Sequence, residues 1–125
     1  MVDERKLFIK ILQLNCFITD EIGFDELYLA VKDEKIWPVN NTYKSVNPGS
    51  TEIDVKIYDL LPNTQLDLEV WDYDYLSSND LLGVLPLFID EPGGPYTTDM
   101  IPNKEETDKA KYSIIWEIDF MNDTD

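Results

Sequence analysis

An aspartate-rich stretch between two predicted strands contains the residues best suited to chemistry. Asp72, Asp74 and Asp80 lie within nine residues of one another, after one apolar alternating run and before another. If this loop folds back on itself, its carboxylates converge, and a pair about 5 Å apart costs roughly 3 kcal/mol at an effective dielectric near 20. Calcium offsets such repulsion, because it takes about six to eight oxygen ligands in flexible geometry. The spacing therefore favours a calcium-binding loop.

The same loop has two other interpretations. An EF-hand beginning at Asp72 needs Asp or Asn at its fifth position, Gly at its sixth and Glu at its twelfth. This chain has Leu76, Ser77 and Gly83 at those positions, so the EF-hand is excluded. A hydrophilic hairpin in a generally acidic protein fits the spacing of the aspartates equally well.

A second acidic loop lies between the first two predicted strands. It runs from Asn15 to Tyr28 and contains Asp20, Asp25 and Glu26. The two loops lie at the same end of a sandwich if the strands alternate in direction. Two acidic loops at matched strand ends strengthen the calcium hypothesis relative to a solvated hairpin.

The charge of the whole chain excludes several classes of function. The 125 residues include 26 Asp and Glu, 10 Lys and Arg and no His, which gives a net charge of -16. Nucleic acid is an unsuitable partner because phosphates require a basic face, and unassisted docking on anionic lipid is unfavourable. Without His there is no imidazole base, and no nucleophile or cofactor motif is present, so we do not expect an enzyme. Cys16, the single cysteine, is expected to be a buried and inert thiol.

Alternation of apolar and polar residues at period two dominates the chain and predicts strands. Turn-forming residues separate the alternating runs at 47–49, 61–63 and 91–95, and a short helical turn is expected only within 105–111. Pro86 interrupts one run, which suits an edge strand. We therefore predict one all-β domain, an antiparallel sandwich of seven or eight strands. The alternating runs are 7–11, 27–31, 36–37, 53–57, 66–70, 84–88 and 112–118.

The aspartate loop resembles the third calcium-binding loop of C2 domains. Trp-Asp-x-Asp at 71–74 is followed by five residues and then by Asp-x-x-Gly at 80–83. The first loop is similar to its C2 counterpart more loosely, with Asp-Glu-Leu-Tyr at 25–28 where the family often has Asp-Pro-Tyr. The resemblance covers roughly 6–119 of a single domain spanning 1–125, with an acidic tail at 121–125. It implies an antiparallel eight-stranded β-sandwich of C2 type that holds two or three calcium ions between loops at one end, typically to dock on phospholipid.

The resemblance also assigns individual calcium ligands. The carboxylate ligands would be Asp20, Asp25, Asp72, Asp74 and Asp80. Weaker candidates are the backbone carbonyls of Thr19, Tyr73 and Ser78 and the hydroxyl of Ser77. The family usually separates its two first-loop aspartates by six residues, whereas Asp25 follows Asp20 by five and Glu26 follows it by six. Glu26 is therefore an alternative for the second position, although Asp25 is preferred because the family uses aspartate there.

Apolar residues occupy the tips of both loops. They are Ile22 and Phe24 in the first loop and Tyr75 and Leu76 in the third. Membrane-binding C2 domains place apolar residues at these tips, so the resemblance makes all four residues candidate membrane contacts. The alternative is that these side chains pack against one another or under a neighbouring loop.

The expected partners are calcium and either a phospholipid membrane, bound in a calcium-dependent manner, or another protein. Lys32 and Lys35 alternate with acidic residues, so a basic face for inositol lipids is absent or weak. A metal-independent acidic inhibitor that covers a basic partner surface explains the charge equally well, but not the paired aspartate loops. Residues 1–10 do not resemble a signal peptide, and no apolar run reaches the length of a bilayer span. We therefore expect a cytoplasmic protein that associates peripherally with membranes.

Overall fold

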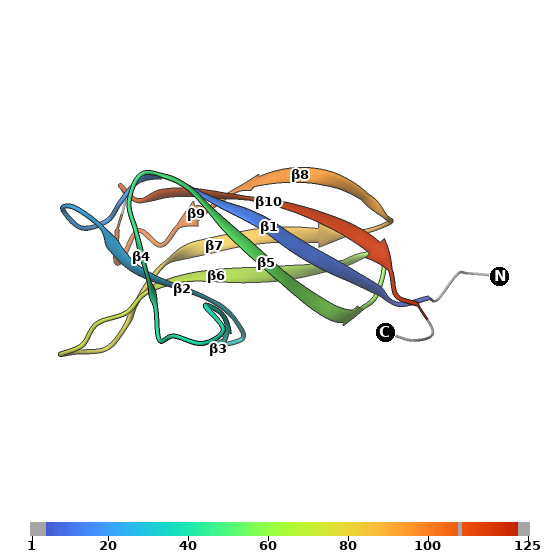
Figure 1. Ribbon diagram of the computed structural model, residues 1–125, viewed down its shortest axis with the longest axis horizontal. Coiled ribbons are helices and arrows are strands. Elements are labelled where there is room, and N and C mark those ends of the chain that lie inside the picture. The colour runs from blue at the N-terminus through green and yellow to red at the C-terminus, as the bar shows by residue number, and fades with distance from the viewer. Residues whose placement is uncertain (1–4, 108, 123–125) are drawn as a thin grey trace.

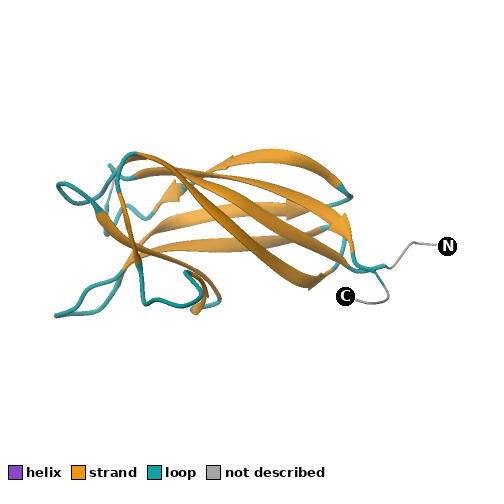
Figure 2. Cartoon of the chain, viewed as in Figure 1, coloured by secondary structure: helices purple, strands orange, loops and turns teal. Residues whose placement is uncertain are grey.

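Two antiparallel sheets pack face to face in the computed structural model, which describes residues 5–107 and 109–122 (Figures 1 and 2). Within these residues the regular elements are all strands, and the predicted all-β sandwich is confirmed. One sheet has the order β5-β1-β10-β8, and the other has the order β3-β2-β6-β7-β9 with β4 beside β2. The strands are β1 Leu7–Ile18, β2 Asp25–Val31, β3 Glu34–Trp37, β4 Lys44–Val46, β5 Gly49–Leu60, β6 Thr64–Asp72, β7 Asp80–Ile89, β8 Gly93–Asp99, β9 Ile101–Pro102 and β10 Lys111–Phe120.

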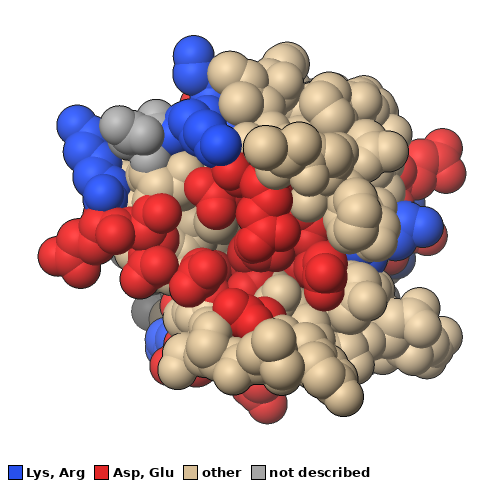
Figure 3. Space-filling view, turned by 90° about the vertical axis from the view of Figure 1, so that its left-hand side faces the viewer, with Lys and Arg blue, Asp and Glu red and all other residues tan. Residues whose placement is uncertain are grey.

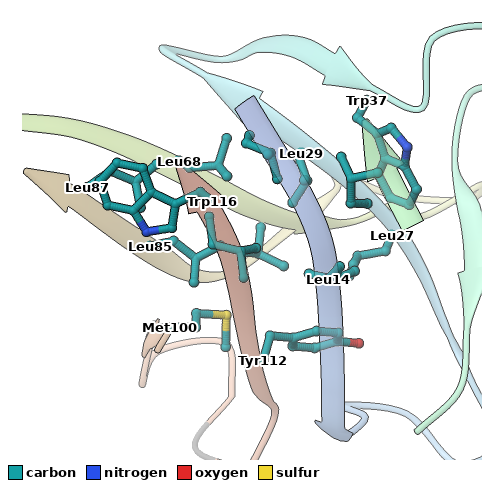
Figure 4. Close-up of a cluster of buried hydrophobic side chains, with 14 of the residues drawn as sticks. Leu14, Leu27, Leu29, Trp37, Leu68, Leu85, Leu87, Met100, Tyr112 and Trp116 are labelled. Atoms are coloured by element: carbon teal, nitrogen blue, oxygen red, sulfur yellow. The ribbon is translucent and has the colours of Figure 1, made fainter. Parts of the chain in front are cut away.

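The core lies between the two sheets because each long strand turns one alternating face inward. In β1, every second residue from Leu7 to Ile11 is fully buried while the residues between them remain half-buried. Leu68, Leu85 and Leu87 of the second sheet lie around the indole of Trp116 from the first sheet (Figure 4). Fully burying one Leu or Ile side chain contributes about 1.5–3 kcal/mol, so this layer holds the sheets together. Cys16 is buried in the same layer, as expected.

The strand predictions succeed wherever the alternating pattern is clear. The structure departs from them in two weakly patterned places, the very short strands β4 and β9 and the segment 91–95. Eight strands form the two main layers, and the very short β4 and β9 extend the second sheet. The predicted turn at 91–95 is wrong in its second half, because Gly93 to Pro95 belong to β8, where Gly93 pairs with Ile118 of β10. Pro86 lies in β7 opposite Asp67, beyond the part of β7 that pairs with β9, so it occupies an edge as predicted.

Three loops gather at one end of the sandwich, on the left of Figure 1. They are loop one (19–24, between β1 and β2), loop three (73–79, between β6 and β7) and the β9–β10 loop (103–110). The last of these contains a short turn that begins earlier than the predicted 105–111, since the N–H groups of Glu106 and Thr107 both donate to the carbonyl of Asn103. β1 begins and β10 ends at the opposite end of the molecule, so the strands present the acidic loops together at one end.

The predicted tail at 121–125 starts in contact with the sandwich. The N–H of Met121 donates to the carbonyl of Lys6 at 3.0 Å, and its sulfur accepts from the N–H of Asp59. Residues 123–125 lie outside the described part of the chain. Among the described residues, no helix is long and apolar enough to cross a membrane.

Candidate metal centre

Asp25 is the first residue of β2 and faces inward at the open end of the sandwich, where it is fully buried. One carboxylate oxygen accepts from the N–H of Asp20 at 2.9 Å, and the other accepts from the N–H of Glu21 at 3.0 Å. The hydroxyl of Tyr112 in β10 also donates to Asp25. Burial, followed by the hydrogen bond and charge of Asp25, raises the pKa of the Tyr112 phenol far above its ordinary value. Asp25 therefore ties loop one to both sheets.

Asp72 ends β6 beside Asp25 and is also buried, with only 3% of its surface exposed. Its carboxylate accepts from the N–H of Glu26 at 2.9 Å. Burial is the main cause that raises the pKa of Asp72 to about 7, and the charges of Glu21, Asp25 and Asp20 raise it further. Burial is also the main cause that raises the pKa of Glu21, while the neighbouring side chain of Asp72 acts against that rise. Near neutral pH the Asp72 carboxyl is therefore only partly ionised, and calcium or another cation bound there would favour its ionised form.

Asp80 begins β7 and lies directly across from Asp72 in the antiparallel β6–β7 pair. Like charges at directly opposite positions destabilise a strand pair. Asp80 also raises the pKa of Glu106 in the β9–β10 loop, as the largest of several causes that include the charges of Glu105 and Asp20. The N–H of Asn103 donates to the carbonyl of Leu82 at 2.7 Å and holds this loop against the end of β7.

Asp74 folds back onto its own loop. Its carboxylate accepts from the N–H groups of Leu76 and Ser77, and from the Ser77 hydroxyl at 2.6 Å. The Ser77 hydroxyl is the main cause that lowers the pKa of Asp74, and the Leu76 N–H comes next. The N–H of Asp74 donates to the side chain of Asn79, which fixes the base of loop three.

The weaker candidates take part in the backbone of the loops. Thr19 donates through its hydroxyl to the carbonyl of Glu21, and the carbonyl of Ser78 accepts a long 3.5 Å bond from Ser77. The N–H of Tyr73 donates to the carbonyl of Glu26 at 2.7 Å and joins loop three to β2. Glu26 itself is half-buried, whereas Asp25, with which it alternates along β2, is fully buried and faces the core.

Acidic side chains crowd the end of the molecule that carries the three loops (Figure 3). The structure places Asp20, Asp25, Asp72 and Asp80 in this region, with Asp74 turned into its own loop. Among the described residues, no three Asp, Glu or Cys side chains are arranged in a group that could hold a metal ion. Sequence analysis missed Glu21 and Glu106. Glu21 directly follows a predicted ligand, whereas Glu106 approaches Asp80 only through long-range strand pairing.

The four loop-tip residues are exposed to solvent. The exposed fractions are 99% for Ile22, 44% for Phe24, 84% for Tyr75 and 89% for Leu76. Ile22, Tyr75 and Leu76 are therefore largely solvated, whereas Phe24 is partly covered. Exposing large apolar side chains next to an acidic surface is costly in water and is typical of interaction sites.

Comparison with solved structures identifies the architecture. The chain is similar to a C2 domain (domain A) of plant extended synaptotagmin 1, with a TM-score of 0.55 and 12% identity over 95% of this chain and 97% of that one. It is also similar to a structure described as a C2 domain, with a TM-score of 0.52 and 16% identity over 91% of this chain and 97% of that one. No protein-family model and no curated protein sequence matches the chain. The similarity confirms the resemblance at the level of three-dimensional structure, and the chain has the fold of a C2 domain.

Proposed function

We propose that this protein is a calcium-dependent membrane-docking module. The observation that carries the proposal is the position of two exposed apolar loop tips beside one acidic end of the sandwich. Ile22 and Leu76 are almost fully solvated, so they gain from burial in a lipid interface without loss of internal packing. The acidic surface between them repels anionic lipid until its charge is offset.

The donor groups at this end fit calcium chemically. Calcium prefers carboxylate and carbonyl oxygens, and every titratable donor here is an oxygen. Asp20, Asp25, Asp72, Asp74 and Asp80 would hold two or three ions, which would supply positive charge at the membrane-facing end. To take part, Asp74 must give up its bonds within loop three, and Asp72 must be ionised against the effect of its burial.

Thermal unfolding with calcium and with EDTA tests the metal-binding half of the proposal. At about 100 times its dissociation constant, a ligand that binds only the folded state adds roughly 2.7 kcal/mol, which corresponds to a shift in Tm on the order of 10 °C. We expect Asp80→Asn and Asp74→Asn to abolish this shift. Asp67→Asn is the matched control, because Asp67 is exposed in β6 away from the loops. Identical melting curves with calcium and EDTA would refute calcium binding.

Vesicle sedimentation tests the membrane half separately. Vesicles of phosphatidylcholine and phosphatidylserine should pellet the protein with calcium and leave it in solution with EDTA. Ile22→Ser and Leu76→Ser should weaken pelleting while the calcium-induced shift in Tm persists. Leu61→Ser is the control, since Leu61 is 51% exposed in the turn between β5 and β6 at the opposite end of the sandwich.

A second candidate function is metal-independent binding to a basic protein surface. The hydrogen bonds that already satisfy Asp25 and Asp74 favour it, because these carboxylates need no cation in the structure. A calcium-induced shift in Tm without calcium-dependent pelleting would indicate a calcium-regulated protein partner. Absence of both effects would leave the acidic interaction protein as the better hypothesis.

A further inference from the structure

A groove of about 660 Å³ lies beside loop three, on the outer side of the second sheet. Tyr28 of β2 and Tyr73 of loop three form part of its wall, with Asn79 at the end of that loop between β6 and β7. Residues 39–42, in the connection from β3 to β4, form the opposite side. None of the candidate calcium carboxylates lines this groove.

Two pairs of stacked aromatic rings flank the groove. Tyr28 stacks on Trp71 with an angle of 4° between the ring planes, and Tyr73 stacks on Tyr43 with an angle of 18°. These side chains are partly solvated rather than buried in the core, and Tyr43 is 37% exposed. Partly exposed aromatic faces attract planar cations, and arginine more than lysine, because guanidinium stacks flat on a ring.

Two carboxylates and one ammonium group lie around these rings. Asp33 lines the groove, and its N–H donates to the carboxylate of Glu69, which also accepts from the indole of Trp71 at 3.0 Å. Both carboxylates act on the same ring, since after burial the charges of Asp33 and Glu69 raise the pKa of Tyr28. Lys35 is the cation that lines the groove, and its ammonium donates to the carbonyls of Pro38 and Asn41.

Hydrogen bonds hold the walls of the groove in place. The side-chain amide of Asn79 donates to the Tyr28 hydroxyl at 2.9 Å, and its oxygen accepts from the N–H of Asp74. The two bonds of Lys35 fix the opposite wall. A prearranged site loses less conformational entropy when a side chain enters it.

We propose that this groove binds an arginine side chain presented by a peptide segment of a partner protein. The guanidinium stacks on the Tyr28 and Tyr73 side of the groove and faces the carboxylate of Asp33, with the charge of Glu69 acting from outside the lining. The groove shares Tyr73 with the proposed calcium site but none of the candidate carboxylate ligands, and the proposal does not require calcium. A neutral oligosaccharide could also use aromatic and amide groups, but it would leave the two carboxylates without an opposing charge.

An NMR titration in EDTA tests the proposal directly. The probe is an acetylated Gly-Arg-Gly-Arg-Gly peptide added to the ¹⁵N-labelled protein, with the indole N–H of Trp71 and the amides of Tyr28, Tyr73 and Asn79 as reporters. The same peptide with citrulline in place of arginine keeps the shape but removes the charge. We expect changes at these reporters with the arginine peptide and at least roughly fivefold weaker binding of the citrulline peptide.

Two matched variants locate the effect. Asp33→Asn should weaken binding of the arginine peptide roughly fivefold, and the left-handed backbone at this position (φ 67°) accepts Asn readily. Asp59→Asn is the control, because Asp59 also has left-handed backbone (φ 63°) and an exposed carboxylate but lies in β5 near the opposite end. Equal loss in both variants would reduce the effect to net charge and overturn the proposal.

Three other outcomes would also overturn it. Equal binding of the citrulline peptide would show that charge is not recognised. Changes at the same reporters with maltotriose but not with the arginine peptide would assign the groove to carbohydrate. Changes that follow protein concentration without any peptide would assign it to a second copy of the chain.

Discussion

Two features of the structure disfavour the ionised form of Asp72: its carboxylate is buried, and it lies opposite another aspartate. Its pKa of about 7 means that the folded protein keeps a proton that the unfolded chain loses near pH 4. Unfolding therefore releases a proton between these pH values, and the free energy of unfolding falls as pH rises toward 7. Calcium-free protein should lose roughly 1–2 kcal/mol of stability between pH 5 and pH 8, after allowance for screening by water at the open end.

Urea unfolding in EDTA across this pH range measures the effect. Asp72→Asn removes the titrating group and should flatten the profile, while Asp67→Asn should retain it. A wild-type profile that rises with pH would contradict the assigned environment of Asp72. The pKa of Glu21 is also raised, so the free energy of unfolding of the Asp72→Asn variant should still fall slightly as pH rises.

Tyr112 gives a second residue-scale prediction. Its buried hydroxyl donates to Asp25, and Phe at this position would leave that carboxylate with two backbone donors and one fewer partner. Tyr112→Phe should cost about 1–2 kcal/mol in the free energy of unfolding, measured by urea denaturation. Tyr58→Phe is the control, since Tyr58 is 44% exposed and should change stability little. Equal stability of both variants would show that the bond to Asp25 does not anchor loop one.

At the scale of elements, Gly83 positions the β9–β10 loop. A Cβ atom at this residue would lie 2.4 Å from the carbonyl oxygen of Ile101 and 2.7 Å from the side chain of Met100. The carbonyl belongs to the backbone of β9, so β9 must move away from β7 to make room. Gly83→Ala should destabilise the fold by about 2–3 kcal/mol, as expected for overpacking.

Hydrogen exchange can locate this effect along the chain. The amides of β9 and the β9–β10 loop should lose protection in Gly83→Ala more than those of β1 and β5. Gly49→Ala is a contrasting variant, because its Cβ meets no atom within 4 Å but its φ of 136° strains any side chain. Gly49→Ala should lower the free energy of unfolding without reducing the hydrogen-exchange protection of the β9 amides.

Sequence analysis predicts the strands whose own residues alternate between apolar and polar, because that pattern needs no information from distant parts of the chain. β8 was mistaken for a turn at its start, because Gly93, Gly94 and Pro95 are turn formers and their pairing with β10 depends on distant residues. The candidate site divides in the same way. Aspartate spacing predicted which loops are acidic, but Asp25 is satisfied by Tyr112, 87 residues away, and Glu106 meets Asp80 only through folding. Local spacing cannot encode either contact.

On the scale of the whole molecule, the acidic residues responsible for the net charge of -16 form two groups, those at the loop end and those spread over both sheets. The buried carboxylates at the loop end generate repulsion over a few ångströms, which dissolved salt screens poorly. Exposed acids, such as those paired with Lys6 and Lys10, lie across both sheets and are screened well. Sodium chloride and calcium should therefore stabilise the protein by different routes.

Raising sodium chloride from low salt to about 0.3 M should increase Tm by a few degrees, because screening weakens the repulsion among all exposed acids. Asp80→Asn should keep this response, since one charge is a small part of the total. Calcium added at constant ionic strength should raise Tm further in the wild type but not in Asp80→Asn, because Asp80 is a ligand in the proposed calcium site. Magnesium at the same concentration is the comparison that removes any general effect of divalent charge. If magnesium matches calcium and the variant responds like the wild type, calcium acts only as a screening ion, and the acidic end serves solubility or a basic partner instead.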